Sequence, residues 1–228
     1  MRTALGLAKP TEGVIMTATN GITAVTSADE LRSILGEPSD RVKTKERNYL
    51  TDVDKKWISA SPFLLMSTSD VEGNCDVSPK GDPAGSLAIT PDASTLIIPE
   101  RPGNRRADGF HNILSNPHIG LVFFIPGRGD TLRVNGRATV VREAPYFDDL
   151  IVKGHRPILA TQVEVQEVFF HCAKAFMRSG LWKPETWNPT AMPPHAQLVK
   201  AVQDIPQTLE ELTEYYAHGY EKQLYEIR

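Results

Sequence analysis

The residues best suited to chemistry lie in one segment, ERPGNRRADGFHNILSNP, which covers residues 100–117. Residues 102–104 make a turn, and Arg105 and Arg106 follow at the point where a helix is expected to begin. Free backbone N–H groups and two guanidinium groups would converge there, and such a cluster binds phosphate. Each well-formed charged hydrogen bond contributes roughly 1.5–3 kcal/mol. The alternative is an arginine pair on a solvated loop, which carries about equal weight on composition alone.

Other kinds of catalytic or metal site find little support. No Ser/His/Asp, Cys/His or His-Glu-x-x-His arrangement can be identified, and carboxylates such as Asp76 and Asp82 are too scattered to nominate an acid–base pair. His171 beside Cys172 lacks the second pair of ligands that a metal centre needs, so we expect no metal. Cys75 and Cys172 lie far apart in the sequence and are expected to be reduced thiols.

Composition argues against several classes of partner. The 228-residue chain has a formal net charge of -3 and a pI near 6.1, which gives no general attraction to nucleic acid or anionic membrane. Nucleic-acid binding through Arg101, Arg105 and Arg106 is therefore the weakest hypothesis considered. The sequence shows no signal-peptide pattern and no long apolar run, so we expect a cytoplasmic protein with no membrane partner.

Capping signals predict two helices near the start of the chain. Ser27 and Glu30 form a capping box for a short helix that Gly36 can end. A second helix is predicted before Pro62, and its packing face is expected to comprise Tyr49, Leu50, Val53 and Trp57. Residues 1–26 show no clear periodicity and are interpreted as an extension.

From residue 63 onward, short β-rich runs alternate with turn residues. The predicted strands cover residues 63–69, 75–80, 86–90, 95–99, 118–125, 131–142 and about 161–170, and the predicted helices between them cover residues 106–115 and 144–153. Crossover helices are mostly missing, which argues against a parallel sheet. The expected fold is mainly β with flanking helices (α+β): a six- to seven-stranded antiparallel split β-barrel of Greek-key type.

The C-terminal part continues with a short helix after Cys172 and a proline-rich arm over residues 184–194. Thr208 and Glu211 form another capping box. The packing stripe of the last helix is expected to comprise Leu209, Leu212, Tyr216 and Tyr220. We therefore divide the chain into an N-terminal extension with a short helix (1–44), a barrel domain (45–182), and a proline-rich arm with a C-terminal helix packing on the barrel (183–228).

The glycine turn, the Asn-Arg-Arg run, the helix, the Ser-Asn-Pro sequence and the strand HIGLVFFIPG together resemble the flavin mononucleotide (FMN) site of the pyridoxamine 5′-phosphate oxidase-like family. The resemblance runs from about Asn48 to Trp182. It implies an FMN-binding split barrel in which Arg105 and Arg106 bind the flavin phosphate, with Asn104 at the turn. It also implies that an earlier strand lies along the isoalloxazine and ribityl chain; its residues here are Val77, Ser78, Pro79, Lys80 and Gly81.

The same resemblance suggests roles for single side chains. Lys80 would supply positive charge or a hydrogen bond to the reduced flavin; otherwise it is a solvated lysine at a hairpin end. The passage HCAKAFMRSGLW (171–182) resembles a late segment in one branch of the family, where residues reach the cofactor of the neighbouring subunit. Arg178 and Trp182 are the candidates for that contact. Ordinary packing beneath the proline-rich arm is an equal alternative for Trp182.

The leading hypothesis is an FMN-dependent oxidoreductase that passes electrons or hydride between a small-molecule substrate or nicotinamide donor and the flavin. The alternative is a non-catalytic module that binds or stores a flavin, haem or deazaflavin. The oxidase of vitamin B6 metabolism has an Arg-x-His near its C-terminus, and this chain has Arg-Ser-Gly-Leu-Trp instead, so pyridoxamine phosphate is a doubtful substrate. A homodimer with the cofactor at the subunit interface is expected, because a cleft between two copies desolvates a large ring better.

Overall fold

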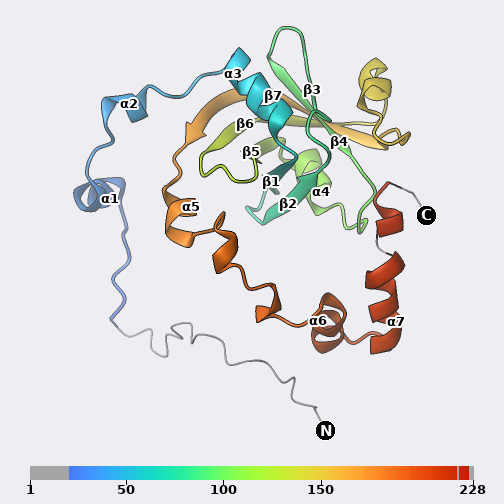
Figure 1. The fold of residues 1–228 in the computed structure, drawn as a ribbon. Coiled ribbons are helices and arrows are strands. Elements are labelled where there is room, and N and C mark those ends of the chain that lie inside the picture. Colours follow the sequence, from blue (N-terminus) through green and yellow to red (C-terminus); the bar gives the residue numbers. More distant parts are fainter. Residues whose placement is uncertain (1–20, 220, 226–228) are drawn as a thin grey trace. The chain divides into compact units, whose positions relative to one another are not determined.

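The computed structural model describes residues 21–219 and 221–225, and Figure 1 shows their fold. Seven strands form one antiparallel sheet in the order β2-β1-β5-β6-β7-β4-β3. Their bounds are β1 Phe63–Ser69, β2 Cys75–Gly81, β3 Ala88–Ile89, β4 Thr95–Glu100, β5 His118–Phe124, β6 Thr131–Val141 and β7 Leu159–His171. The order does not return to β2, so the barrel is split. The predicted antiparallel split barrel with flanking helices is confirmed.

The helices are short and lie mostly before and after the strands. The α-helices are α1 Ala28–Leu35, α2 Asp40–Lys43, α3 Asp52–Ala60, α4 Asp108–Ser115, α5 Lys174–Ser179, α6 His195–Val202 and α7 Leu209–Glu214. Short 3-10 helices cover Pro145–Leu150, Pro184–Thr186, Pro189–Ala191 and Glu221–Gln223, and a π-helical turn covers Tyr215–Gly219. The caps predicted at Ser27, Gly36 and Thr208 are all present.

Curling of the sheet places strands from its two ends around one apolar core. Leu64 and Met66 of β1 share a buried cluster with Leu96 and Ile98 of β4, although three strands separate β1 from β4 in the sheet. Phe123 of β5 is fully buried in the same cluster. Burial of such side chains is the main favourable term in folding. It therefore draws the two ends of the sheet toward each other.

Helix α4 packs against β1, β2 and β6 and fixes the loop that precedes it. Its Gly109 is buried, and a Cβ there would lie 3.2 Å from Asp76 Oδ2 and 3.3 Å from Met66 Cε. The glycine therefore permits a close approach of the helix to the sheet. Asn112 Nδ2 donates a hydrogen bond to Thr68 Oγ1 at 3.1 Å, which anchors the helix to β1.

A buried carboxylate holds α3 against the barrel. Asp54 accepts hydrogen bonds from Arg47 Nη1 at 2.5 Å, Arg47 Nη2 at 3.1 Å and Thr51 Oγ1 at 2.6 Å, and its side chain is fully buried. The backbone of Arg47 forms a bridge with Val168 of β7. The start of α3 is thereby tied to the sheet by charge and by backbone pairing.

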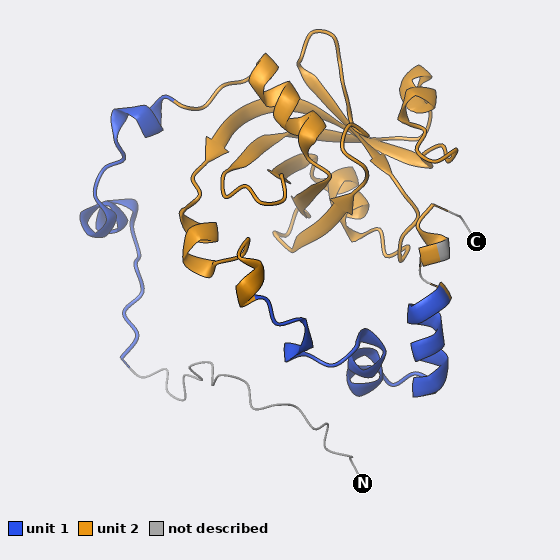
Figure 2. Cartoon of the chain, in the orientation of Figure 1, with its two compact units in different colours: residues 1–44, 187–218 blue, residues 45–186, 219–228 orange. Residues whose placement is uncertain are grey.

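The chain divides into two compact units, which Figure 2 colours separately. One contains residues 45–186 and 219–228 and carries the barrel; the other contains residues 1–44 and 187–218. In the second unit, Ala196 and Val199 of α6 pack against Leu212 of α7. The division into 1–44, 45–182 and 183–228, and the packing of the C-terminal helix on the barrel, remain predictions.

One predicted helix has a different type and length, and one helix was not predicted. The helix predicted over residues 144–153 is a 3-10 helix that ends at Leu150. Burial of Phe147 and Leu150 beside Ile97 sets its shape. Helix α6 was not predicted; it begins directly after Pro194 and buries two apolar residues, Ala196 and Val199, rather than a long stripe.

The predicted packing stripes are only partly correct. Of the stripe predicted for α3, Leu50 and Trp57 are buried, whereas Tyr49 is 56% exposed and Val53 is 63% exposed. Tyr49 and Leu50 both precede the helix. In the last helix, Leu212 is buried, whereas Leu209 is 43% exposed. Tyr220 lies outside the described residues, as does most of the 1–26 extension. Helical spacing identified the helices but not which neighbours each face would meet.

The Arg47–Asp54 pair predicts how stability depends on pH. Burial raises the pKa of Asp54, but hydrogen bonds from Arg47 and Thr51 outweigh it and lower the pKa below its ordinary value. The charged carboxylate therefore stabilises the fold above the unfolded pKa of about 3.9, and this contribution is lost as pH falls through the folded pKa. Asp54→Asn should cost about 3 kcal/mol at pH 7 in urea unfolding, and its difference from wild type should shrink at pH 3.

Asp52→Asn is the matched control. Asp52 is the first residue of the same helix, with an exposed side chain paired to Lys55, so the same change should alter stability by under about 1 kcal/mol. Equal losses from the two variants at pH 7 would contradict the role given to Asp54.

Gly136 lies at a β-bulge between β6 and β7, where we predict that no side chain is tolerated. A register shift occurs at Asn135/Gly136, and a Cβ on Gly136 would collide with the carbonyl oxygen of Glu164. Gly136→Ala should therefore lower the unfolding free energy by about 1–3 kcal/mol, measured by urea unfolding. In Gly120→Ala the nearest atom to the new Cβ is the movable Asn135 Oδ1 at 3.3 Å. That variant should lose less, and the reverse ranking would refute the explanation.

Candidate functional site

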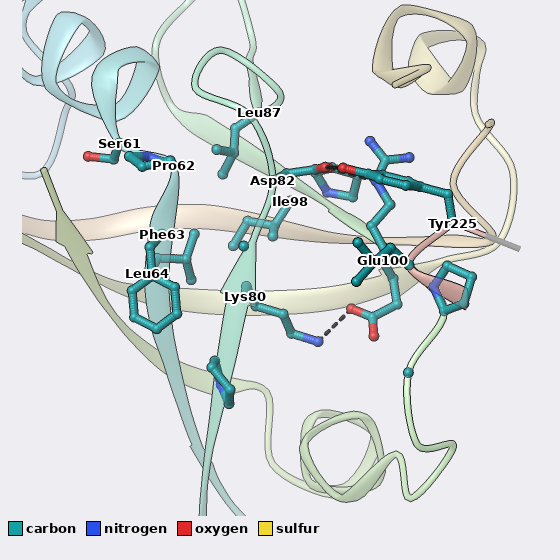
Figure 3. Close-up of a pocket in the computed structure, with 17 residues that line it drawn as sticks. Ser61, Pro62, Phe63, Leu64, Lys80, Asp82, Leu87, Ile98, Glu100 and Tyr225 are labelled. Atoms are coloured by element: carbon teal, nitrogen blue, oxygen red, sulfur yellow. Dashed lines mark hydrogen bonds and ion pairs between the residues drawn. The ribbon is translucent and has the colours of Figure 1, made fainter. Parts of the chain in front are cut away.

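Two ion pairs join the ends of the sheet across the split. Lys80 Nζ of β2 lies 2.5 Å from Glu100 Oε2 of β4, as Figure 3 shows. Directly after these strands, Arg101 Nε lies 2.6 Å from Asp82 Oδ2. All four side chains are at most 17% exposed. The two ends of the sheet are thus linked by side chains where a closed barrel would have backbone hydrogen bonds.

A pocket of about 340 Å³ lies at these strand ends. Its size is within the range of small-molecule sites. The walls combine apolar side chains with the two ion pairs (Figure 3). The lining residues are Ser61, Pro62, Phe63, Leu64, Pro79, Lys80, Gly81, Asp82, Leu87, Ile98, Pro99, Glu100, Arg101, Pro102, Gly103, Leu224 and Tyr225. Parts of both motifs singled out in the sequence, residues 79–81 and 102–103, therefore contribute to one pocket. The other predicted site residues of these motifs are not among the lining residues: Val77, Ser78, Asn104, Arg105 and Arg106.

Arg101 has a structural part in this wall. Besides Asp82, its guanidinium donates to the carbonyl oxygens of His155 at 3.3 Å and Leu150 at 2.8 Å. With three partners inside the protein, Arg101 is committed to holding the loop after β4. It is therefore a poor candidate for binding an external anion.

The turn after β4 has the geometry expected of an anion site. Asn104 Oδ1 accepts a hydrogen bond from the backbone N–H of Arg106 at 3.0 Å. Arg105 and Ala107 adopt positive φ angles of 62° and 59°, a conformation that is unfavourable for residues other than glycine and often found at functional sites. Helix α4 begins at Asp108, and its N-cap residue, Ala107, makes no side-chain capping hydrogen bond. The N–H groups of Phe110 and His111 donate to the carbonyl oxygen of Ala107, so those of Asp108 and Gly109 are the donors that could bind an anion.

The two arginines of the turn are both exposed. Arg106 Nε lies 2.7 Å from Asp108 Oδ2, and this hydrogen bond and charge raise the pKa of Arg106 above its ordinary value. Exposed pairs of this kind contribute only about 0–1 kcal/mol. A more strongly charged anion could therefore replace Asp108 as the partner of Arg106 at little cost.

The predicted strand residues 77–81 lie on β2, at one edge of the sheet. Ser78 and Lys80 are partly buried, and Ser78 Oγ donates to Asp76 Oδ2 at 2.7 Å. Val77, Pro79 and Gly81 alternate with them and are exposed. Lys80 is not the solvated lysine of the alternative interpretation, because Glu100 and the ring of Phe110, 5.1 Å away, surround its ammonium group.

Arg178 and Trp182 are not among the pocket-lining residues of their own chain. Trp182 Nε1 donates to the carbonyl oxygen of Arg128 at 2.6 Å, and its ring stacks on Phe176 with centroids 6.0 Å apart. Phe176 in turn contacts Phe124 of β5. Arg178 is exposed near the end of α5. The structure thus brings Pro79, Lys80 and Gly81 together with Pro102 and Gly103 at one pocket. Trp182 belongs to a separate aromatic cluster, and Arg178 is exposed on α5.

Most residues that line the pocket were not assigned to a site from the sequence, and among them Glu100, Asp82 and Tyr225 supply polar groups to its wall. Asp82 was noticed only as an isolated carboxylate. Each strand end carries a basic and an acidic residue, Lys80 with Asp82 and Glu100 with Arg101. That complementary pattern is the one available signal, and it becomes meaningful only once the two strand ends are known to meet.

Two further findings concern the part of the chain that the structure describes. Within residues 21–219 and 221–225, no group of three or more His, Cys, Asp or Glu side chains is placed to hold a metal ion. In the same residues, no helix has the length and apolar character needed to cross a membrane.

Comparison with known structures finds several similar proteins. HupZ from Group A Streptococcus is 22% identical, with a TM-score of 0.43, over 53% of this chain and 93% of that one. A Clostridium acetobutylicum protein related to general stress protein 26, of the pyridoxinephosphate oxidase family, is 13% identical, with a TM-score of 0.38 over 52% and 85%. An F420 reductase is also 13% identical, with a TM-score of 0.38 over 54% and 98%. No curated protein matches the chain.

A family match covers the barrel and every pocket-lining residue except Leu224 and Tyr225. Residues 50–172 match the family described as pyridoxamine 5′-phosphate oxidase, which is just over half of the 228 residues. The match includes β1 to β7, both ion pairs and the 102–106 turn. The chain therefore belongs to the pyridoxamine 5′-phosphate oxidase family.

Proposed function

We propose that this protein is an FMN-dependent oxidoreductase that acts as a homodimer on a small-molecule substrate or a nicotinamide donor. Membership of an oxidase family supports the coarser statement, an oxidoreductase-like function with a flavin or deazaflavin. The observation that carries the choice of FMN is the 102–106 turn beside the pocket, since it offers donors for one phosphate group.

The charge of the pocket argues for separate sites for the phosphate and the ring. Lys80 pairs with Glu100 and Arg101 pairs with Asp82, so the ionic groups of the lining cancel each other. A dianion gains little from a neutral set of charges, whereas the turn next to it places Arg105 and Arg106 beside the start of α4. Arg106 pairs with Asp108, but that pair is exposed, so an incoming phosphate could replace the carboxylate. The phosphate would therefore bind at the turn and the flat ring in the pocket.

Residues of β2 would hold the flavin ring. As an edge strand, β2 has backbone N–H and C=O groups without a strand partner on one side, and a flavin ring carries complementary donors and acceptors. Lys80 lies at the pocket wall and would stabilise negative charge on the ring. Bound FMN would supply the hydride or electron transfer that amino-acid side chains do not provide.

The outer face of β2, β1 and β5 supports dimer formation. Leu65 of β1 pairs with Pro79 of β2 and with Val122 of β5, which gives a continuous apolar row across three strands. Phe63 and Val77 on the same face are 40% and 56% exposed. An exposed apolar patch of this kind marks an interaction surface. Because β2 contributes both to this face and to the pocket, a dimer formed here would place the cofactor beside the interface.

The phosphate hypothesis predicts how affinity depends on the ligand. Arg105→Ala and Arg106→Ala should each weaken FMN binding at least about tenfold, because each removes a charged hydrogen-bond donor. Riboflavin, which has the same ring without the phosphate, should bind wild type and variants with similar affinity. Fluorescence titration of both ligands measures this difference.

Arg142→Ala is the matched control, since Arg142 is an exposed arginine just after β6 and away from the turn. It should leave both affinities unchanged. If the arginine variants bound FMN as tightly as wild type, the site assignment would be wrong. If wild type bound no flavin at all, the proposed function would fail with it.

Turnover separates the enzyme from a non-catalytic flavin module. Anaerobic addition of reduced nicotinamide dinucleotide, with or without phosphate, should bleach the visible absorption of the bound flavin within seconds to minutes. A flavin that stays oxidised with these donors and with candidate substrates would favour the binding or storage module instead.

The dimer hypothesis predicts the effect of one charge on the apolar row. Val122→Glu should convert the protein to a monomer in light scattering and weaken FMN binding, because a carboxylate buried in an apolar interface is strongly unfavourable. Ser59→Glu, on an exposed position of α3, should leave both properties unchanged. A wild-type monomer that binds FMN tightly would refute the shared-site arrangement.

A further inference from the structure

The end of the chain returns to the barrel and forms part of the pocket wall. Leu224 and Tyr225 both line the pocket, after the short 3-10 helix Glu221–Gln223. Figure 3 shows the ring of Tyr225 beside Asp82, with Glu100 below it. These residues lie outside the 50–172 family match. The pocket therefore has one wall that the shared barrel does not supply.

Tyr225 is held in this position by several contacts. Its hydroxyl donates to Asp82 Oδ1 at 2.8 Å, while Asp82 Oδ2 accepts from Arg101. The ring of Tyr225 stacks with His155 at a centroid distance of 5.8 Å and an interplanar angle of 26°. Arg101 and Lys153 approach the ring at 5.8 Å and 5.3 Å. One carboxylate thus ties together the loop after β4 and the chain end.

The protonation state of Tyr225 favours its hydrogen bond to Asp82. Burial raises the pKa of Tyr225 above its ordinary value, and the hydrogen bond to Asp82 raises it further. The phenol therefore stays neutral at physiological pH and remains a donor. Asp82 in turn has both oxygens engaged, one by Tyr225 and one by Arg101.

We propose that Tyr225 is a ligand-binding residue, which closes the split-barrel pocket over the isoalloxazine ring of the flavin. The inference rests on the proposed function, and it assigns to the chain end a part in binding the same cofactor. An aromatic side chain suits this position because its ring can cover a flat ligand while its hydroxyl stays anchored to the protein. The segment 221–225 would act as a cover that slows release of the ligand.

Two variants of Tyr225 test the proposal in the full-length protein. Tyr225→Phe keeps the ring and removes the hydrogen bond to Asp82, and should weaken FMN binding about three- to tenfold. Tyr225→Ala removes ring and hydrogen bond, and should weaken it by roughly tenfold or more. A cover over the pocket slows dissociation of the ligand, so most of the loss of affinity should come from a faster dissociation rate, which stopped-flow measurement determines. Riboflavin should show the same losses, since the contact is with the ring.

Tyr49→Ala is the control, because Tyr49 is an exposed tyrosine that does not line the pocket. It should leave affinity and dissociation rate unchanged. Thermal unfolding of the ligand-free proteins should show similar midpoints for wild type and all Tyr225 variants, which separates a binding role from a purely structural one.

The outcomes distinguish this inference from the proposed function. If wild type binds FMN and Tyr225→Ala binds and releases it at wild-type rates, the role of Tyr225 is refuted while the flavin function stands. If affinity falls only together with the unfolding midpoint, Tyr225 is a structural residue and the inference is again refuted. If wild type binds neither FMN nor riboflavin, both proposals fail.

Discussion

Two ion pairs across an incomplete sheet are the interaction on which the rest of the site depends. Among the described strands, β2 has β1 as its one neighbour and β3 has β4, so the barrel is linked there by Lys80–Glu100 and Arg101–Asp82. Partly buried pairs add little net stability, because desolvation offsets their attraction. Their effect is on geometry, since side chains reach further than a backbone hydrogen bond and keep the strands apart. Apolar residues in these positions would let the split collapse and fill the pocket.

The same pairs determine where negative charge can bind. With each cation of the pocket wall matched by a carboxylate, any net attraction for an anion must come from outside the wall. We propose that the turn at Arg105 and Arg106 supplies it. Positive φ angles at Arg105 and Ala107 are unfavourable for residues other than glycine. Strained backbone and two exposed arginines thus coincide at one turn, as expected for the proposed binding site.

Local residue patterns predicted most strands and helices, whereas features that depend on contacts between distant residues were not predicted. Turn residues such as those between β1 and β2 predicted the hairpins, and the capping box at Thr208 predicted the start of α7. At α1 the predicted box is half formed: Ser27 caps the helix, but the Glu30 carboxylate accepts from the N–H of Thr26 instead of Ser27. The exposure of Val53 and the 3-10 helix at Pro145 depend on neighbours that no local pattern describes. Lys80 and Glu100 are twenty residues apart, and their pairing depends on how far the sheet curls. The motifs could therefore be found by sequence, but not the pocket that they share.

The pocket combines residues within the family match with residues beyond it. The barrel, its ion pairs and the turn lie within the 50–172 match, whereas Tyr225 reaches the pocket from beyond it. A common barrel can bind a common cofactor, because cofactor recognition uses backbone groups and a few charges. Asp82, which orients both Arg101 and Tyr225, is the residue through which these two parts of the pocket are coupled.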